Sequence, residues 1–166
     1  MEKVLVSACL LGKPVRYNGK GLAAASDILT RWQIEGRLVL VCPEVDAGMS
    51  IPRAPAEIVR GDGTDVWLGK SEVIKETGTD VSVYFKKGAQ LALALCQKHH
   101  IKVAVLTESS PSCGSNTIYN GHFSNNKIAG MGVTAALLRK HGIEVFSQYD
   151  LVAADSALQS VMPTGD

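Results

Sequence analysis

The sequence has almost no excess of charge of either sign. Its 166 residues include 17 Lys and Arg against 16 Asp and Glu, for a formal net charge of +1. This balance argues against broad, non-specific attraction to nucleic acid or to an anionic membrane surface. No apolar run approaches the roughly 20 residues that a helix needs to cross a membrane. We therefore expect a soluble protein with neither a nucleic acid polymer nor a membrane among its partners.

No export signal is expected at the N-terminus either. Leu5-Val6-Ser7-Ala8-Cys9 resembles the cleavage site of a bacterial lipoprotein, but a signal peptide needs an apolar stretch of about 7–15 residues after a cationic start. Only Met1-Glu2-Lys3 precedes Val4, and Lys13 follows soon after. We interpret this segment as the first strand and predict a cytoplasmic location.

The four cysteines include no Cys-x-x-Cys pair. A zinc ribbon or a thioredoxin-type motif is therefore not supported. Structural disulfides are not expected in the reducing cytoplasm either. The use of each cysteine must follow from its place in the fold.

Four short apolar runs, at 4–8, 38–41, 103–106 and 143–146, predict the strands. They are continuous rather than alternating, which is typical of parallel strands covered on both faces. Helical patterns separate them, at 28–34 behind a Ser26 or Asp27 cap, at 81–99 and at 132–141. The predicted fold is an α/β, open and mostly parallel sheet with helices on both faces, a Rossmann-like arrangement of three layers.

Within the single predicted domain, residues 1–166, two segments depart from this alternation of strands and helices. An insertion at about 57–74 is predicted to form a β-hairpin, with Glu57-Ile58-Val59 and Val66-Trp67-Leu68 as strands around the turn Arg60-Gly61-Asp62-Gly63. The end of the chain, about 154–166, is expected to be weakly anchored.

Three cysteines follow predicted strands. Cys9 and Cys42 come directly after the first and second strands, and Cys113 lies in the polar loop beyond the third. The carboxyl ends of parallel strands share one edge of the sheet, where ligands bind, so we expect these three thiols to converge. Cys96 instead lies in an apolar helix and is expected to pack in the core.

Three converging thiolates are compatible with more than one kind of site. A 4Fe–4S cluster on only three cysteines keeps an exchangeable position on one iron, which can act as a Lewis acid. A zinc ion on three cysteines, completed by His122, is the inorganic alternative. A non-catalytic nucleotide- or base-binding module that uses the same edge of the sheet is the third. Separately, Gly130-Met131-Gly132-Val133-Thr134-Ala135 matches the G-x-G-x-x-A pattern, but no strand is predicted before it, so we interpret it as the ordinary start of a helix.

Other side chains are expected at the same edge. Glu44 lies two residues after Cys42, where a carboxylate can act as a general base toward water. Ser109, Ser110 and Ser112 supply hydrogen-bond donors for a polar ligand. Arg16, Tyr17 and Arg53 could line the same edge.

In combination, these motifs resemble the small bacterial family of thiouracil desulfidases, formerly a domain of unknown function. The similarity spans about residues 3–146 and is carried by Val6-Ser7-Ala8-Cys9-Leu10-Leu11-Gly12, Val15-Arg16-Tyr17, Cys42-Pro43-Glu44-Val45, Pro52-Arg53, Ser109-Ser110-Pro111-Ser112-Cys113-Gly114, Ile118-Tyr119 and Gly132-Val133-Thr134-Ala135.

The resemblance implies a 4Fe–4S cluster held by Cys9, Cys42 and Cys113, which an aerobic preparation could lose. It also implies removal of sulfur from thiolated uracil without net redox change, giving uracil and hydrogen sulfide. Glu44 matches the family's acid/base glutamate, and Ser110 its active-site serine.

The resulting prediction is an iron–sulfur desulfidase for a small thiocarbonyl substrate such as a thiolated nucleobase. Glu44 and Ser110 are the predicted catalytic residues. The predicted substrate-binding residues are Arg16, Asn18, Arg53, Ser109 and Ser112. The chain departs from the family pattern at Asn18, where an aspartate is usual, and at Ala47-Gly48-Met49, where Gly-Gly-Leu is common.

Overall fold

The centre of the computed structural model is a four-stranded parallel sheet, and the structure describes residues 1–13, 16–18 and 26–161. Across the sheet the order is β2 (Leu38–Val41), β1 (Val4–Ser7), β5 (Val103–Leu106) and β8 (Glu144–Ser147). Every neighbouring pair is parallel. The predicted open parallel sheet is confirmed, with β8 displaced by one residue from the predicted run.

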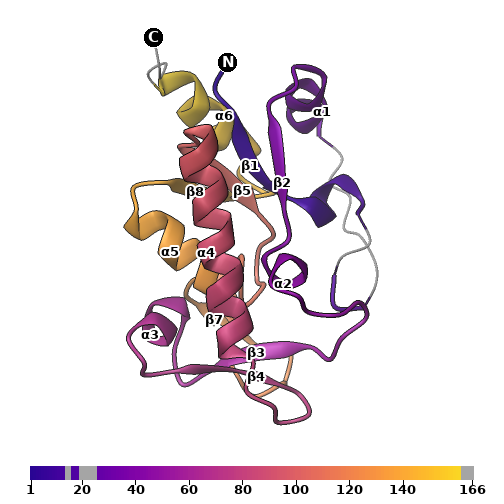
Figure 1. The fold of residues 1–166 in the computed structure, drawn as a ribbon, viewed down its shortest axis with the longest axis vertical. Helices are drawn as coiled ribbons and strands as arrows, with labels where there is room; N and C mark the ends of the chain where they lie inside the picture. The colour runs from indigo at the N-terminus through magenta and orange to yellow at the C-terminus, as the bar shows by residue number, and fades with distance from the viewer. Residues whose placement is uncertain (14–15, 19–25, 162–166) are drawn as a thin grey trace.

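Helices cover both faces of the sheet, as predicted (Figure 1). On one face lie α4 (Ser82–His99) and α5 (Val133–Lys140), and on the other α1 (Asp27–Ile34) and α6 (Leu151–Ser160). Alternate strand residues point to opposite faces: Leu5 packs in the α4–α5 core, and Val4 and Val6 in the α1–α6 core. None of the described helices is long and apolar enough to span a membrane.

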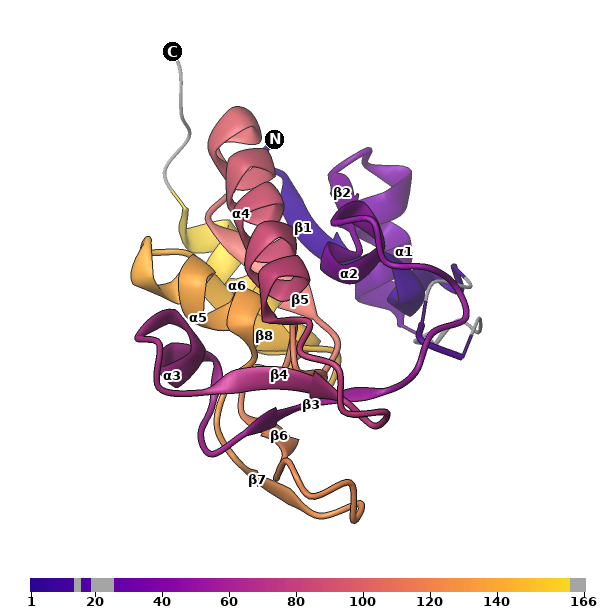
Figure 2. The same ribbon diagram turned by 60° about the horizontal axis from the view of Figure 1, so that its bottom comes forward.

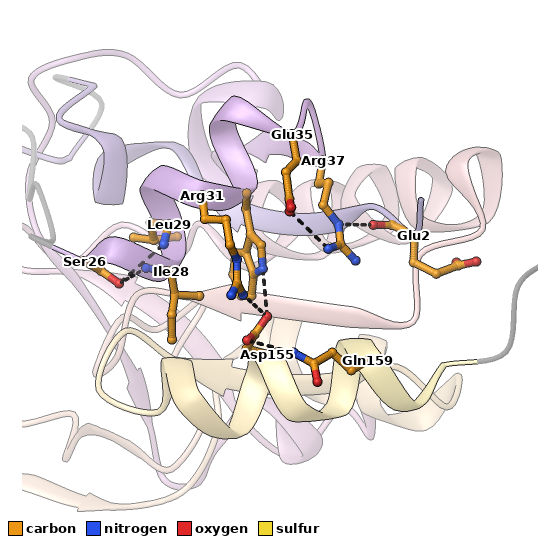
Figure 3. Close-up of polar contacts among 10 residues, drawn as sticks. Glu2, Ser26, Ile28, Leu29, Arg31, Glu35, Arg37, Asp155 and Gln159 are labelled. Carbon is orange, nitrogen blue, oxygen red and sulfur yellow. Dashed lines mark hydrogen bonds and ion pairs between the residues drawn. The ribbon is translucent and has the colours of Figure 1, made fainter.

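The α1–α6 layer is fixed by polar contacts as well as by packing. The Ser26 hydroxyl caps α1 by accepting hydrogen bonds from the backbone N–H groups of Ile28 and Leu29 (Figure 3). Arg31 and the Trp32 indole of α1 both donate to the Asp155 carboxylate of α6. Burial acts to raise the pKa of Asp155, but these two hydrogen bonds outweigh it, and the pKa is lowered.

These contacts overturn part of the prediction for the end of the chain. The segment expected to be weakly anchored from residue 154 is helical as far as Ser160, and Ala154 and Leu158 are buried against the sheet. The helical pattern of apolar residues is weak in this segment, because only two turns of α6 carry clearly apolar residues. The sequence therefore does not predict a helix here. The remainder of the predicted tail, 162–166, lies outside the described residues.

A second region, at the far end of the molecule, consists of two antiparallel hairpins that lie side by side (Figure 2). One pairs β3 (Ala56–Val59) with β4 (Glu72–Lys75), and the other pairs β6 (Thr117–Tyr119) with β7 (Lys127–Ala129). The predicted hairpin insertion is therefore present, and its first strand is the predicted one.

The predicted second strand of that insertion is wrong. Val66 and Trp67 lie in a short helix, α3 (Gly63–Trp67), and the true partner of β3 is β4. The cause is a capping box: the Asp62 carboxylate accepts from the N–H groups of Thr64 and Asp65, and the Asp65 carboxylate accepts from the N–H of Asp62. This reciprocal pair begins a helix where the turn was expected.

The four parallel strands run toward the end of the molecule that carries the hairpins (Figure 1). β1 leads into the 3-10 helix η1 (Ala8–Leu11), β2 into the short helix α2 (Pro43–Asp46), and β5 into the loop that carries the serines. The carboxyl edge of the sheet therefore faces the second region.

Candidate functional site

A cavity of about 760 Å³ lies between the carboxyl edge of the sheet and the two hairpins. This volume is within the range of small-molecule sites. Its wall combines residues that follow strands of the sheet with residues of the second region. The wall includes Cys42, Glu44, Arg53, Ser110, Cys113 and Phe123.

The structure brings the three predicted ligand cysteines together at this edge. Cys9 lies in η1, Cys42 is the N-cap of α2, and Cys113 lies in the loop after β5. All three are thiols rather than disulfides. Burial raises the pKa of Cys113, and the charges of Cys42 and Cys9 raise it further, so the three groups interact with one another. Their role as ligands stays a prediction.

Cys9 contacts the cavity wall through the side chain of Thr107. Its Sγ lies 2.9 Å from the Thr107 hydroxyl, and Thr107 lines the cavity. Burial raises the pKa of the Cys9 thiol, while the Thr107 hydrogen bond and the positive charge of Arg16 act in the opposite direction. Burial likewise raises the pKa of Cys42. All three thiols therefore resist ionisation when no cation is bound.

The donor set fits an iron–sulfur cluster better than a single ion. Three thiolates in a buried site require a compensating cationic group, because an unpaired buried charge is costly. A zinc ion needs all its donors within about 2.0–2.3 Å of one point, and no three His, Cys, Asp or Glu side chains in the described part of the chain are arranged in that way. A four-iron cluster binds each thiolate through a different iron, so it accepts sulfurs that are farther apart.

Cys96 has the packing role that was predicted for it. It lies on α4, is 1% exposed and packs in the core with Leu5 and Leu138. Burial alone raises its pKa to about 12. Cys96 is absent from the cavity wall among the described residues.

Glu44 lies in the first turn of α2, where Pro43 at the start of the helix fixes the backbone. Its Oε2 accepts hydrogen bonds from both Nε (2.8 Å) and Nη2 of Arg53. The Arg53 side chain is 3% exposed, and that of Glu44 15%. Arg53 was predicted to bind substrate, but its guanidinium is directed at Glu44.

Ser110 organises the loop that carries Cys113. Its Oγ accepts hydrogen bonds from the backbone N–H groups of Ser112 and Cys113, each at 3.1 Å. Because a hydroxyl can donate as well as accept, the Ser110 proton remains available for a ligand in the cavity. The structure is thus compatible with the predicted role of Ser110.

The remaining predicted substrate contacts, Ser112, Ser109, Asn18 and Arg16, stay predictions. The Ser112 hydroxyl pairs with the buried Thr134 hydroxyl at 2.7 Å, and the Ser109 hydroxyl with that of Thr117 at 3.0 Å. Both serines also line the cavity, where the loop folds back on α5 and β6. Asn18 is exposed and is not among the described residues that line the cavity. Arg16 does line it.

Glu108 is a functional candidate that sequence reasoning missed. Its carboxylate accepts hydrogen bonds from the backbone N–H groups of Ser109, Ser115, Asn116 and Thr117. Burial acts to raise the pKa of Glu108, but these bonds outweigh it, and the pKa is lowered. The sequence signal that could have identified Glu108 is an acidic residue close to the end of a predicted strand, followed by a loop of polar residues.

The glycine-rich segment before α5 does not form a phosphate site. The N–H groups of Gly132, Val133 and Thr134 donate to backbone carbonyls of the Cys113 loop at 2.8 Å. A Cβ on Gly132 would lie 2.4 Å from the backbone of Ser112, so glycine here allows α5 to approach that loop closely. The N–H donors that a phosphate would need at this segment are already used.

Comparison with known proteins adds independent evidence. The sequence profile of the family described as 2-thiouracil desulfurase matches residues 4–150. An uncharacterised protein of Bacillus subtilis strain 168, YbbK, is 45% identical over 148 residues, which cover 89% of this chain and 97% of that protein. A solved structure described as a [4Fe–4S]-dependent thiouracil desulfidase, TudS, matches with a TM-score of 0.89 and 47% identity, covering 97% of this chain and 100% of that one.

Proposed function

Since this chain belongs to the 2-thiouracil desulfurase family, we propose that it is a [4Fe–4S]-dependent desulfidase that removes sulfur from thiouracil or a closely related thiolated nucleobase. The likeness to TudS over nearly the whole of both chains supports the enzyme class and the cofactor. The observation that carries the proposal is the meeting of Cys9, Cys42 and Cys113, as mutually interacting thiols that form no disulfide, beside a cavity that contains Glu44. We further propose a cytoplasmic location, where free thiols persist.

In this proposal Cys9, Cys42 and Cys113 hold the cluster as thiolates. When bound, a cluster with three protein ligands supplies one iron with an exchangeable position, a Lewis acid for the thiocarbonyl sulfur. Arg16 offsets part of the thiolate charge, since its positive charge lowers the pKa of Cys9. The protein thus contributes the ligands, part of the charge balance and the walls of the site.

The reaction is written as a hydrolysis with no net transfer of electrons. Water adds oxygen to the thiocarbonyl carbon, the carbon–sulfur bond breaks, and thiouracil plus water gives uracil plus hydrogen sulfide. Glu44 accepts one proton from the water and returns it to the departing sulfur, and the second proton leaves the added hydroxyl for the sulfur as the new carbonyl forms. Ser110 donates its hydroxyl proton in a hydrogen bond that orients the heterocycle.

Anaerobic reconstitution followed by iron and sulfide counts tests the proposal, together with sulfide release from 2-thiouracil. Cys9→Ala, Cys42→Ala and Cys113→Ala should each abolish the brown colour and the activity. Cys96→Ala, the matched control, should keep both, because that thiol packs in the core. A protein that binds 2-thiouracil tightly without a cluster, unaffected by the first three substitutions, would instead be a binding module.

Glu44→Gln separates the cluster from the proton transfer. The variant should keep its iron and its colour, since no cluster ligand is changed. Its turnover should fall by about 10²- to 10⁴-fold, the usual contribution of a positioned acid or base. Wild-type turnover in Glu44→Gln would remove Glu44 from the mechanism.

A further inference from the structure

We infer that Arg53 is a positioning residue for desulfidation: it holds one oxygen of Glu44 and leaves the other free to exchange a proton in the cavity. The inference rests on the proposed function, since it assigns Arg53 a part in the reaction of that same site. It replaces the expectation that Arg53 contacts the substrate.

The contact between the two side chains is asymmetric. An arginine commonly meets a carboxylate as a fork, with one N–H group on each oxygen. Here Nε and Nη2 both donate to Oε2 of Glu44. No hydrogen bond reaches Oε1 from any of the described residues. One carboxylate oxygen is therefore fixed by two charge-assisted bonds, and the other keeps its full accepting capacity.

Arg53 is itself fixed at several points. Its Nη1 donates to the Ser50 carbonyl at 3.1 Å, and its backbone N–H donates to the Tyr17 carbonyl at 2.6 Å. With only 3% of its side chain exposed, the guanidinium has lost nearly all its hydration. A buried cation of this kind is stable only beside a charged partner, and Glu44 provides one.

The place of Arg53 in the chain explains why it can act this way. It lies in the segment between α2, which carries Glu44, and β3, which belongs to the second region. The guanidinium therefore ties the Glu44 carboxylate to the connection between the two walls of the cavity. A proton-transferring group must be held in its productive geometry, and a displacement of about 1 Å can cost a hundredfold in rate.

The test compares four forms of the reconstituted enzyme in sulfide release from 2-thiouracil: wild type, Arg53→Gln, Glu44→Gln and the double variant. Rates are expressed per bound cluster, measured from iron content and visible absorbance. Arg53→Gln should lower kcat by about 10- to 100-fold, as loss of a supporting contact typically does, with little change in KM. In the Glu44→Gln background the same substitution should add no further loss, because Arg53 acts through Glu44.

Two additional variants complete the comparison. Arg53→Lys should recover part of the kcat, since a lysine keeps the charge but cannot place two donors on one oxygen. Arg60→Gln, the matched control, removes an arginine from an exposed ion pair with Glu72 and should leave kcat and KM at wild-type values. A crystal structure of Arg53→Gln should show the Glu44 carboxylate displaced from its wild-type position.

Three outcomes would overturn the inference. A raised KM with unchanged kcat in Arg53→Gln would make Arg53 a substrate contact. A further loss in the double variant, multiplying that of Glu44→Gln, would show that Arg53 acts independently. An undisplaced Glu44 in the Arg53→Gln structure would show that the clamp is not needed. A cluster-loaded wild type without sulfide release would instead refute the proposed function.

Discussion

The four cysteines show how one residue type acquires different chemistry from its surroundings. Cys96 and Cys113 are both buried, at 1% and 5% exposure. The pKa of Cys96 is raised by burial alone, whereas the pKa of Cys113 is raised by burial and also by the charges of Cys42 and Cys9. A cation bound at the site would offset those negative charges and so lower the pKa of Cys113. It would not act in this way on Cys96, whose pKa is raised by burial alone. Burial alone therefore does not distinguish a packing cysteine from a ligand.

Alkylation of the cluster-free protein should reveal this difference. With a pKa of about 12, Cys96 is ionised to only about one part in 10⁴ at pH 8, and the thiolate is the reactive form. Cys42 is half-buried and lines the cavity, so iodoacetamide should label it first, as followed by peptide mass spectrometry. In urea all four cysteines should react alike. Labelling of Cys96 before Cys42 in the folded protein would contradict the assignment.

At the scale of elements, the loop between β5 and β6 is fixed from three sides. Glu108 gathers the backbone N–H groups of its central residues. Its carbonyls accept from the first turn of α5, and Arg139 donates to the carbonyls of Ser115 in the loop and Val145 in β8. Since this loop places Cys113 and Ser110, its rigidity determines how well the site is organised before a ligand arrives.

The Glu108 carboxylate should therefore make stability depend on pH in the acid range. Its folded pKa is lowered, so its contribution is fully present above the unfolded value of about 4.3 and is lost as the pH falls through the depressed folded value. Glu108→Gln should lower the melting temperature clearly at pH 7. The difference from wild type should shrink as the pH falls below about 4, when the wild-type carboxyl becomes protonated.

Thermal unfolding followed by circular dichroism, at several pH values, measures this difference. The matched control is Glu144→Gln, at an exposed position of β8, where a surface change should cost less than about 0.5 kcal/mol at every pH. A Glu108→Gln deficit that stays constant down to pH 3 would mean that the carboxylate charge does not stabilise the loop.

At the scale of the whole molecule, the sequence predicts those contacts between distant residues that follow from the arrangement of parallel strands. Continuous apolar runs imply covered parallel strands, and parallel strands share one carboxyl edge, so the meeting of Cys9, Cys42 and Cys113 was predictable. The capping box of α3 was readable as Asp62 followed by Asp65, but the turn residues around it favoured a hairpin. The β6–β7 hairpin carries no such signal, because β7 is short and exposed along its whole length.

The partnerships within the site were beyond sequence reasoning for a different reason. The ion pair of Arg53 and Glu44 depends on how the segment after α2 turns back toward that helix, and no periodicity encodes that path. The same holds for Ser109 and Ser112, which line the cavity as expected but whose hydroxyls also pair with those of Thr117 and Thr134. Sequence patterns predict which residues reach the edge of the sheet, while short polar contacts decide which of them face a ligand.

The cavity as a whole depends on the second region keeping its place, and Glu57 is central to that. Glu57 lies in β3 and is 8% exposed. Its Oε1 accepts hydrogen bonds from the N–H groups of Gly121, at 2.8 Å, and Phe123, at 3.3 Å, in the connection between β6 and β7. One buried carboxylate thus ties the two hairpins together and fixes Phe123 in the cavity wall.

Glu57→Ala should therefore loosen the cavity wall without touching the cysteines. Loss of a charged acceptor for two partly buried N–H groups should cost about 1.5–3 kcal/mol of unfolding free energy. KM for 2-thiouracil should rise about tenfold, equivalent to about 1.4 kcal/mol of binding. The value of kcat per cluster should change little, because Glu44 and Ser110 lie on the sheet side.

The control is Glu72→Ala, in the partner strand but in an exposed ion pair. This variant should cost about 0–1 kcal/mol and leave KM unchanged. An unchanged KM in a destabilised Glu57→Ala would mean that substrate contacts only the sheet side of the cavity, and that the hairpins serve stability alone.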